Sequence, residues 1–442
     1  MLRIENGRVL TRDPEHPWFD DGAVAIDGES IVCVGRRQDV AAAYPQAEVL
    51  DAGGGLIMPA LINLHHHIYS ALSRGLTIRG YAPKGFGDIL EGLWWRLDGC
   101  LNNEDNRASA LVTAVDCIKN GVTTVFDHHA SYGQTEDSLF VLAEALRGAG
   151  LRCCLCYETS DRHGPAQAAR AIRENAAFIR HCRRQNDPGL QGMMGLHASF
   201  TLSPATLEQA VTAAEGAGLH IHVAEGPVDE EDCLAKYGCR VVRRLADCGA
   251  LSPKTIAVHG VFLDEEEIDL LREHQVIVAH NPESNMGNAV GCPPVMRMMA
   301  RGVLCGLGTD GYTGDMLESY KAANLIHKLA LADCNAAWQE APQMLFVNNP
   351  QIAACFFAPP LGVLRPGAAA DVIVLDYHPI TPMDAANADA HLLFGVNGRS
   401  VQSTVAAGRI LMKNRQLTAL DEEQIAGQAR QQAASLWARI NA

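Results

Sequence analysis

Histidine pairs spaced two residues apart are the first feature of this sequence that could do chemistry. His65 and His67 form one pair, and His220 and His222 form another. On a β-strand alternate side chains share a face, so both imidazoles of a pair can face one site. Imidazoles are common ligands of zinc and of iron(II). We therefore predict that His65 and His67 bind a metal ion together.

A third imidazole and a carboxylate complete a candidate ligand set. Within the second pair, His222 lies nearer the carboxyl end of its apolar run and is better placed as a ligand than His220. Asp310, within the stretch 308–311, could supply the carboxylate, although Asp-Gly is also a common turn dipeptide. Such a set suits one divalent ion per chain, zinc first and iron(II) as the alternative, that keeps a water molecule as its remaining ligand.

The elements that must position these residues are short apolar runs that alternate with helical patterns. The runs predict eight strands, at 61–66, 123–127, 152–157, 192–196, 220–224, 255–259, 276–279 and 303–308. Eight strand–helix units fit an α/β fold of the (β/α)8 TIM-barrel type, and a doubly wound sheet is the alternative that the pattern leaves open. In a TIM barrel the carboxyl ends of the strands carry the active site, and the candidate ligands lie at such ends.

Both ends of the chain predict β-structure outside the barrel. Apolar runs near the N-terminus are broken by Asn-Gly and Asp-Gly turn signals, and further apolar runs lie near the other end of the chain. We expect a small β-sandwich domain built from both termini. The expected boundaries are 1–56 and 362–418 for this domain, 57–361 for the barrel and 419–442 for a terminal helix.

Charge and hydropathy exclude several classes of function. The formal net charge of −15 argues against binding to nucleic acid or to an anionic membrane surface, since both select for basic faces. No run approaches the roughly 18 apolar residues that a bilayer span needs. The N-terminal residues are too polar for a signal peptide. We expect a cytoplasmic protein that acts on a small molecule, without a nucleic-acid or membrane partner.

Several motifs resemble those of the amidohydrolase superfamily, and the resemblance covers nearly the whole chain. The stretch 58–67 is similar to the family's first-strand motif that ends in H-x-H, and 222–225 matches the H-x-x-E of its deaminase branch. The stretches 280–286 and 308–311 match two further signatures. The chain most resembles SsnA-type aminohydrolases of the chlorohydrolase and cytosine-deaminase-like group. Ala60 replaces the usual glycine of the first motif, which costs little. The stretch 312–314 departs from many relatives, and this departure affects the substrate assignment and not metal binding.

The resemblance implies a role for the residues of this chain that match these motifs. It implies that the metal ligands are His65, His67, His222 and Asp310. It implies that Glu225 shuttles protons, that His259 holds and polarises the attacking water, and that His197 contacts the substrate. The fourth predicted strand contains no lysine, which favours a mononuclear deaminase over the binuclear hydantoinases. Because relatives commonly dimerise and the terminal helix carries an apolar stripe, we expect a homodimer.

We predict metal-dependent hydrolytic deamination of an amino-substituted, heterocyclic small molecule, in which Asp310 also accepts the water proton. Chlorohydrolase or cyclic-amide hydrolase chemistry on the same site, and a catalytically silent family member, are the alternatives. The segment 68–106 predicts a partly helical lid, whose Trp94 either stacks a flat heterocycle or belongs to the core. His129 is a further candidate for substrate contact. Arg162 is either a contact for an anionic group or an ordinary surface charge.

Overall fold

The computed structural model describes residues 1–442, and each of the eight predicted runs forms a strand in it. These strands are β6 (Leu61–His66), β7 (Val122–His129), β8 (Arg152–Tyr157), β10 (Met194–Ala198), β11 (Leu219–Val223), β12 (Ile256–His259), β13 (Ile277–His280) and β14 (Leu304–Leu307). β7 runs two residues beyond its predicted end, so His129 lies within the strand and its carbonyl accepts a bond from the Glu158 amide. The predicted fourth run is split, because β9 (Leu190–Gly192) pairs with β8 whereas β10 pairs with β11.

The parallel strands form two sheets that meet at both of their seams. One sheet has the order β6-β7-β8-β9 and the other the order β10-β11-β12-β13-β14, and every neighbouring pair in them is parallel. Isolated parallel bridges join His66 to Asp310 at one seam and Thr159 to Leu196 at the other. Since parallel strands end on the same side, the residues at the carboxyl ends of both sheets face one region.

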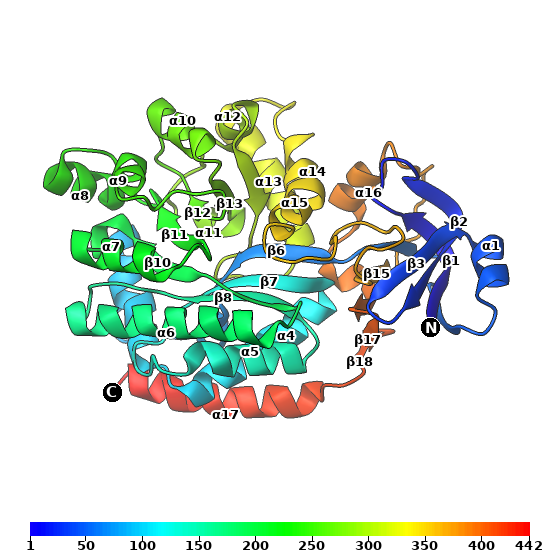
Figure 1. Ribbon diagram of the computed structural model, residues 1–442, viewed down its shortest axis with the longest axis horizontal. Helices are drawn as coiled ribbons and strands as arrows, with labels where there is room; N and C mark the ends of the chain where they lie inside the picture. The colour runs from blue at the N-terminus through cyan, green and yellow to red at the C-terminus, as the bar shows by residue number, and fades with distance from the viewer.

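Helices surround these sheets, and several begin at the caps that the sequence signals (Figure 1). The Ser203 hydroxyl accepts from the Thr206 amide at the start of α7, and Asp264 and Glu267 form a capping box on α10. The helices of this part are α4 (Asn103–Lys119), α5 (Ser138–Gly148), α6 (Pro165–Gln185), α7 (Pro204–Ala213), α8 (Pro227–Tyr237), α9 (Val241–Asp247), α10 (Glu265–Glu273), α11 (Pro282–Gly287), α12 (Val295–Ala300), α13 (Met316–Leu331), α14 (Glu340–Gln343) and α15 (Asn349–Ala353).

A nine-stranded sheet combines strands from both ends of the chain, at the right of Figure 1. Its strands are β1 (Leu2–Leu10), β2 (Trp18–Asp27), β3 (Ser30–Arg36), β4 (Glu48–Asp51), β5 (Leu56–Pro59), β15 (Val372–Leu375), β16 (Val401–Ala406), β17 (Arg409–Lys413) and β18 (Gln416–Leu417). β5 joins the two sets, because it pairs parallel to β1 and antiparallel to β15. The short helices α1 (Arg37–Ala43) and α16 (Ala388–Gly395) accompany these strands. Buried aliphatic side chains from both ends of the chain, such as Ile4 and Val374, share one core.

The segment after β6 is partly helical, as the sequence predicts, and the last helix packs beside it. α2 (Phe86–Ile89), a π-helical turn (Leu90–Trp94) and α3 (Trp95–Cys100) follow one another directly. The last helix, α17 (Glu422–Ile440), packs against α3 and α4 along the base of the view in Figure 1. The Trp437 indole of α17 donates a 2.7 Å hydrogen bond to the Leu72 carbonyl. None of the helices is long and apolar enough to cross a membrane.

Candidate metal centre and active site

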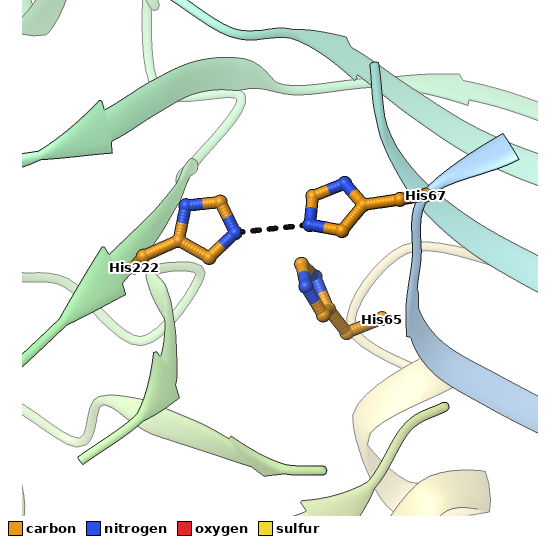
Figure 2. A group of neighbouring side chains, drawn as sticks. All are labelled: His65, His67 and His222. Carbon is orange, nitrogen blue, oxygen red and sulfur yellow. Dashed lines mark hydrogen bonds between the residues drawn. The ribbon is translucent and has the colours of Figure 1, made fainter. Parts of the chain in front are cut away.

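Three histidine rings converge where the two parallel sheets end (Figure 2). His65 and His67 come from the end of β6, and His222 comes from β11. One ligand atom from each ring lies within 4.8 Å of the other two, and the Nε2 atoms of His67 and His222 are 3.2 Å apart. All three residues are buried. The predicted grouping of these three side chains is therefore present in the structure.

The surroundings of the three rings turn their Nε2 atoms toward one another. Each Nδ1 atom has its own partner: the His128 carbonyl at 2.6 Å for His67, the His197 carbonyl at 2.9 Å for His222, and Nε2 of His220 at 2.9 Å for His65. A proton on each Nδ1 satisfies these contacts, which leaves a lone pair on each Nε2. The Nε2 atom of His65 is buried without any hydrogen-bond partner. An unpartnered lone pair in a buried cluster of this kind fits a ligand of a metal ion.

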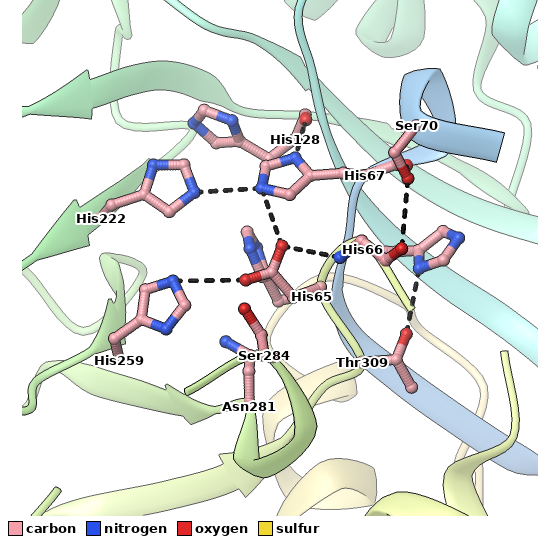
Figure 3. A network of polar contacts seen from close by, with 12 residues as sticks. His65, His66, His67, Ser70, His128, His222, His259, Asn281, Ser284 and Thr309 are labelled. Atoms are coloured by element: carbon pink, nitrogen blue, oxygen red, sulfur yellow. Dashed lines mark hydrogen bonds and ion pairs between the residues drawn. The ribbon is translucent and has the colours of Figure 1, made fainter. Parts of the chain in front are cut away.

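The imidazole of His259 borders the same point (Figure 3), and the Asp310 carboxylate contacts it. Asp310 places one oxygen 3.2 Å from Nε2 of His67 and the other 3.4 Å from Nε2 of His259. The Nδ1 atom of His259 lies 2.8 Å from the Asn285 side-chain oxygen, so its Nε2 faces the cluster. Burial raises the pKa of Asp310, but the imidazoles of His67 and His259 outweigh burial and lower the pKa to about 2. Asp310 is thus an ionised carboxylate beside the imidazoles.

The donor set fits a divalent metal ion. Burial lowers the pKa of His65 and of His222 well below the ordinary value of a histidine, so both rings are neutral, as ligands must be. Two nitrogen ligands of a tetrahedral zinc ion are roughly 3.3 Å apart, given bonds of about 2.0–2.1 Å. The Nε2 atoms of His67 and His222 have this separation.

The backbone at these strand ends is held in unusual conformations. Ala224, His259 and Asp310 all have positive φ, at 48°, 73° and 55°. Non-glycine residues rarely adopt this region, and it costs free energy that the surrounding structure must supply. The Asp310 amide donates to the His65 carbonyl at 2.9 Å, and the His67 amide donates to the Asp310 carbonyl at 3.2 Å. These bonds fix Asp310 against the two histidines of β6.

Glu225 follows β11 and faces the carboxylate side of the cluster. One of its oxygens accepts from the Asn288 amide at 3.0 Å, and the other lies 3.3 Å from Nε2 of His259. Burial raises the pKa of Glu225 to about 7, against the opposing effect of His259. A carboxyl group with such a pKa can both donate and accept a proton near neutral pH, which is the requirement for general acid–base chemistry.

A cavity of about 480 Å³, including its mouth, opens onto the cluster. Its lining includes the predicted residues His67, His222, Glu225, Asp310, His197 and Trp94. The remainder comes largely from the segment 86–98, where Phe86, Leu90 and Trp95 face the cavity. His65 and His259 lie behind this lining and are fully buried. The cavity is therefore bounded on one side by strand ends and on another by the helical segment before α4.

Two predicted contacts lie elsewhere. His129 does not line the cavity; its Nε2 contacts the Ser131 hydroxyl at 2.9 Å, and its ring packs near Tyr69, which does line it. Arg162 is neither a surface charge nor free for an anion, because it is buried between two carboxylates. The sequence did not indicate that Arg162 is buried in this ion pair. One partner, Asp98, lies 64 residues before Arg162, and the other, Glu158, lies four residues before it.

The sequence reasoning ranked His220 below His222 as a ligand, and it did not single out Asp98 and Glu158. His220 contacts His65, although the strand spacing had placed it on the same face as His222. The spacing of His220 and His222 on one face was the signal that could have indicated a supporting role for His220. Asp98 and Glu158 line the cavity, and neither carries a local pattern that distinguishes it from an ordinary acidic residue.

Comparison with known proteins identifies the family to which this chain is similar. The model of the amidohydrolase family matches residues 56–411. A 5-methylthioadenosine/S-adenosylhomocysteine deaminase from Pelotomaculum thermopropionicum is 32% identical over 98% of each chain. Among solved structures, a zinc-bound adenosine deaminase from Xanthomonas campestris has a TM-score of 0.86 at 22% identity over 98% of each chain. The zinc complex of atrazine chlorohydrolase from Arthrobacter aurescens has a TM-score of 0.81 at 24% identity, over 98% of this chain and all of that one. At these identities the two structures show the fold.

Proposed function

The chain belongs to the amidohydrolase family, and from that premise we propose that it catalyses metal-dependent hydrolytic deamination of an amino-substituted heterocycle, with release of ammonia. The observation that carries the proposal is the convergence of three imidazole Nε2 atoms beside an ionised carboxylate, next to a glutamate with a pKa of about 7. Of the heterocycles, an adenosine-like purine is our first choice, because the P. thermopropionicum relative is named for such substrates.

The metal would be held by His65, His67, His222 and Asp310. We propose one ion per chain, zinc before iron(II), since three imidazoles and one carboxylate leave room for a water ligand. When bound, a divalent ion supplies a water molecule whose pKa falls from 15.7 toward about 7.

Three side chains would handle the protons of the reaction. Asp310 would accept the water proton, because its free oxygen faces His259 rather than a backbone donor. His259 would orient the attacking oxygen through Nε2, which Asn285 keeps aimed at the site. Glu225 would protonate the ring nitrogen beside the amino-bearing carbon. Asp310 would pass the water proton to the departing ammonia, and Glu225 would regain a proton from the added hydroxyl group as the carbonyl forms. Positioned acid–base groups of this kind contribute about 10²–10⁴-fold to rate.

Substrate contacts would come from the other residues of the cavity. We propose direct contact for His197 and for Trp94, which could stack on a flat ring. His129 would act behind Tyr69 and not touch the substrate directly.

The architecture that we propose for this chemistry is a (β/α)8 barrel over 57–361. The two bridged seams and the likeness to the X. campestris structure support it. A small β-sandwich domain from 1–56 and 362–418, a terminal helix over 419–442 and a homodimer complete the proposal. The shared core of strands from both ends of the chain supports the small domain.

Chlorohydrolase chemistry is the second candidate, because the A. aurescens enzyme has the same fold. Measuring both ammonia and chloride release by the zinc-loaded protein, over amino- and chloro-substituted purines, pterins, pyrimidines and triazines, tests the proposal. Ammonia from one ring class supports deamination. Chloride without ammonia, or neither product from a fully loaded protein, would contradict it.

A further inference from the structure

Two carboxylates and one guanidinium form a buried group at the cavity, which we call the acidic wall (Asp98, Glu158 and Arg162). Asp98 belongs to α3, Glu158 follows β8, and Arg162 lies before α6. One Nη atom of Arg162 donates to Asp98 at 2.9 Å and to Glu158 at 2.5 Å. The three side chains are between 2% and 7% exposed. Asp98 and Glu158 line the cavity, and Arg162 does not.

Arg162 is held in place behind the two acids through one Nη atom, and its other Nη atom is buried without a partner, outside the cavity lining. Its guanidinium lies over the rings of Trp95 and Tyr132, with 4.6 Å and 4.7 Å to the ring centroids. Two carboxylates against one guanidinium give the wall a formal charge of −1 when both acids are ionised. A substrate anion on this side would therefore meet carboxylates and not the arginine.

The acidic wall has one buried acceptor atom that the protein does not satisfy. The second oxygen of Asp98 is buried without a hydrogen-bond partner. Arg162 uses only one oxygen of each acid, so a second oxygen of Glu158 is also free of the ion pair. Buried acceptors without partners are costly, and a ligand that donates to them removes that cost.

We propose that the acidic wall is a substrate-specificity site that requires hydrogen-bond donors, either N–H or O–H, on the substrate edge facing Asp98 and Glu158, and that disfavours an anion there. The inference rests on the proposed function and names the substrate class of the same site. The donors could come from two sources, the sugar hydroxyls of a nucleoside or a ring N–H of a free base. A site built to bond such groups rejects analogues that lack them, by up to about 10⁴–10⁵-fold.

Matched substrate pairs distinguish the two sources. Ammonia release by the full-length, zinc-loaded protein would be compared for adenosine and 2′,3′-dideoxyadenosine, for adenine and 9-methyladenine, and for guanine and 9-methylguanine. If sugar hydroxyls supply the donors, kcat/KM falls at least about 10²-fold for the dideoxynucleoside. If a ring N–H supplies them, the fall occurs on methylation of the base. Analogues that match their parents within about threefold in every pair that reacts would overturn the proposal.

Variants of Asp98 and Glu158 provide a second test of the proposal. Glu158→Gln and Asp98→Asn should lower kcat/KM for the parent compound by a larger factor than kcat/KM for the donor-free analogue. Glu144→Gln, which removes an exposed ion pair on α5, is the matched control and should change neither value. Equal losses on parent and analogue would indicate a structural role and overturn the proposal. If a variant does not fold, the comparison of matched substrate pairs on the unmodified protein still tests the proposal.

Calorimetric titration of the same pairs separates this proposal from the proposed function. If none of the compounds releases ammonia, the proposed function fails. Tighter binding of the donor-bearing member of a pair would still support the acidic wall, whereas equal binding or the absence of binding in all three pairs would overturn it.

Discussion

Two sides of the cavity, which we call the strand-end wall and the helical wall, are built in different ways. The strand-end wall (His65, His67, His222, His259 and Asp310) draws its residues from four different strands or strand ends, and backbone bonds and Nδ1 partners fix each ring. The helical wall (Phe86, Leu90, Trp94, Trp95 and Asp98) comes from one continuous segment that includes a π-helical turn. The indole nitrogen of Trp95 and one oxygen of Asp98 are buried there without partners.

This difference indicates that the two walls have different functions. A rigid set of rings, fixed through Nδ1 and with the Nε2 atoms of His65 and His259 left without hydrogen-bond partners, suits metal chemistry that must not vary, because small displacements of a catalytic group are costly. On the helical wall the unsatisfied atoms are an indole N–H and a carboxylate oxygen of residues outside the proposed ligand set, which suits recognition, because the substrate supplies the missing partners. Changes to the strand-end wall should therefore affect metal content and kcat, and changes to the helical wall should affect KM and the choice of substrate.

The largest expected effect comes from removing a ligand on the strand-end wall. His222→Ala deletes one of three converging Nε2 atoms, so we expect loss of bound metal and of detectable turnover. Metal analysis and ammonia assays on the same preparation check this. His327→Ala, an equally buried histidine that contacts Cys292 and His280 instead of the cluster, should keep its metal. A His222→Ala protein with full metal content would remove this residue from the ligand set.

The next largest effect comes from changing Glu225, beside the strand-end wall, and it separates catalysis from metal binding. Glu225→Gln should keep the metal and lower kcat by about 10²–10⁴-fold, because an amide cannot shuttle a proton. Burial raises the pKa of Glu225 to about 7, so its carboxyl group loses the proton as pH rises through that value. The rate of the unmodified enzyme should therefore decline above about pH 7, and this limb should be absent from the Gln variant. An unchanged pH–rate profile would exclude Glu225 as the donor.

A smaller effect is expected at the residue that supports a ligand. His220→Ala removes the partner of His65 Nδ1, so the ring loses its fixed orientation. Outer partners of metal ligands are worth about 10–100-fold in metal affinity. Competition with a chelator measures that affinity, and His220→Gln, which retains an acceptor, should recover part of it. Equal affinities for all three proteins would show that His220 does not position His65.

The smallest effect should appear on the helical wall. Trp94→Ala removes a ring from the cavity lining, and a lost aromatic contact of about 0.5–1.5 kcal/mol corresponds to a rise in KM of about 2- to 10-fold. Metal content and kcat should stay the same. The control is Trp338→Ala, which alters a half-exposed indole away from the cavity. A fall in kcat without a change in KM would contradict the division between the two walls.

The two walls also differ in how far the sequence predicts them. The strand-end wall follows from local rules: alternation puts His65 and His67 on one face, and the carboxyl ends of parallel strands meet. The eight strands and the caps at Ser203 and Asp264 follow from equally local signals.

The helical wall depends on contacts that no local pattern encodes. Arg162 pairs with Asp98 across 64 residues of chain, so neither residue differs in sequence from an ordinary surface charge. The break between β9 and β10 has the same origin, because it depends on which neighbouring strand each residue pairs with.

The most direct test of the central claim is an X-ray anomalous-difference map, recorded at the zinc edge on crystals of the zinc-loaded protein. We predict one strong peak per chain, within bonding distance of Nε2 of His65, His67 and His222 and of one oxygen of Asp310. A loaded crystal without a peak at this point, or with its only strong peak elsewhere, would contradict the assignment of the strand-end wall as the catalytic metal centre.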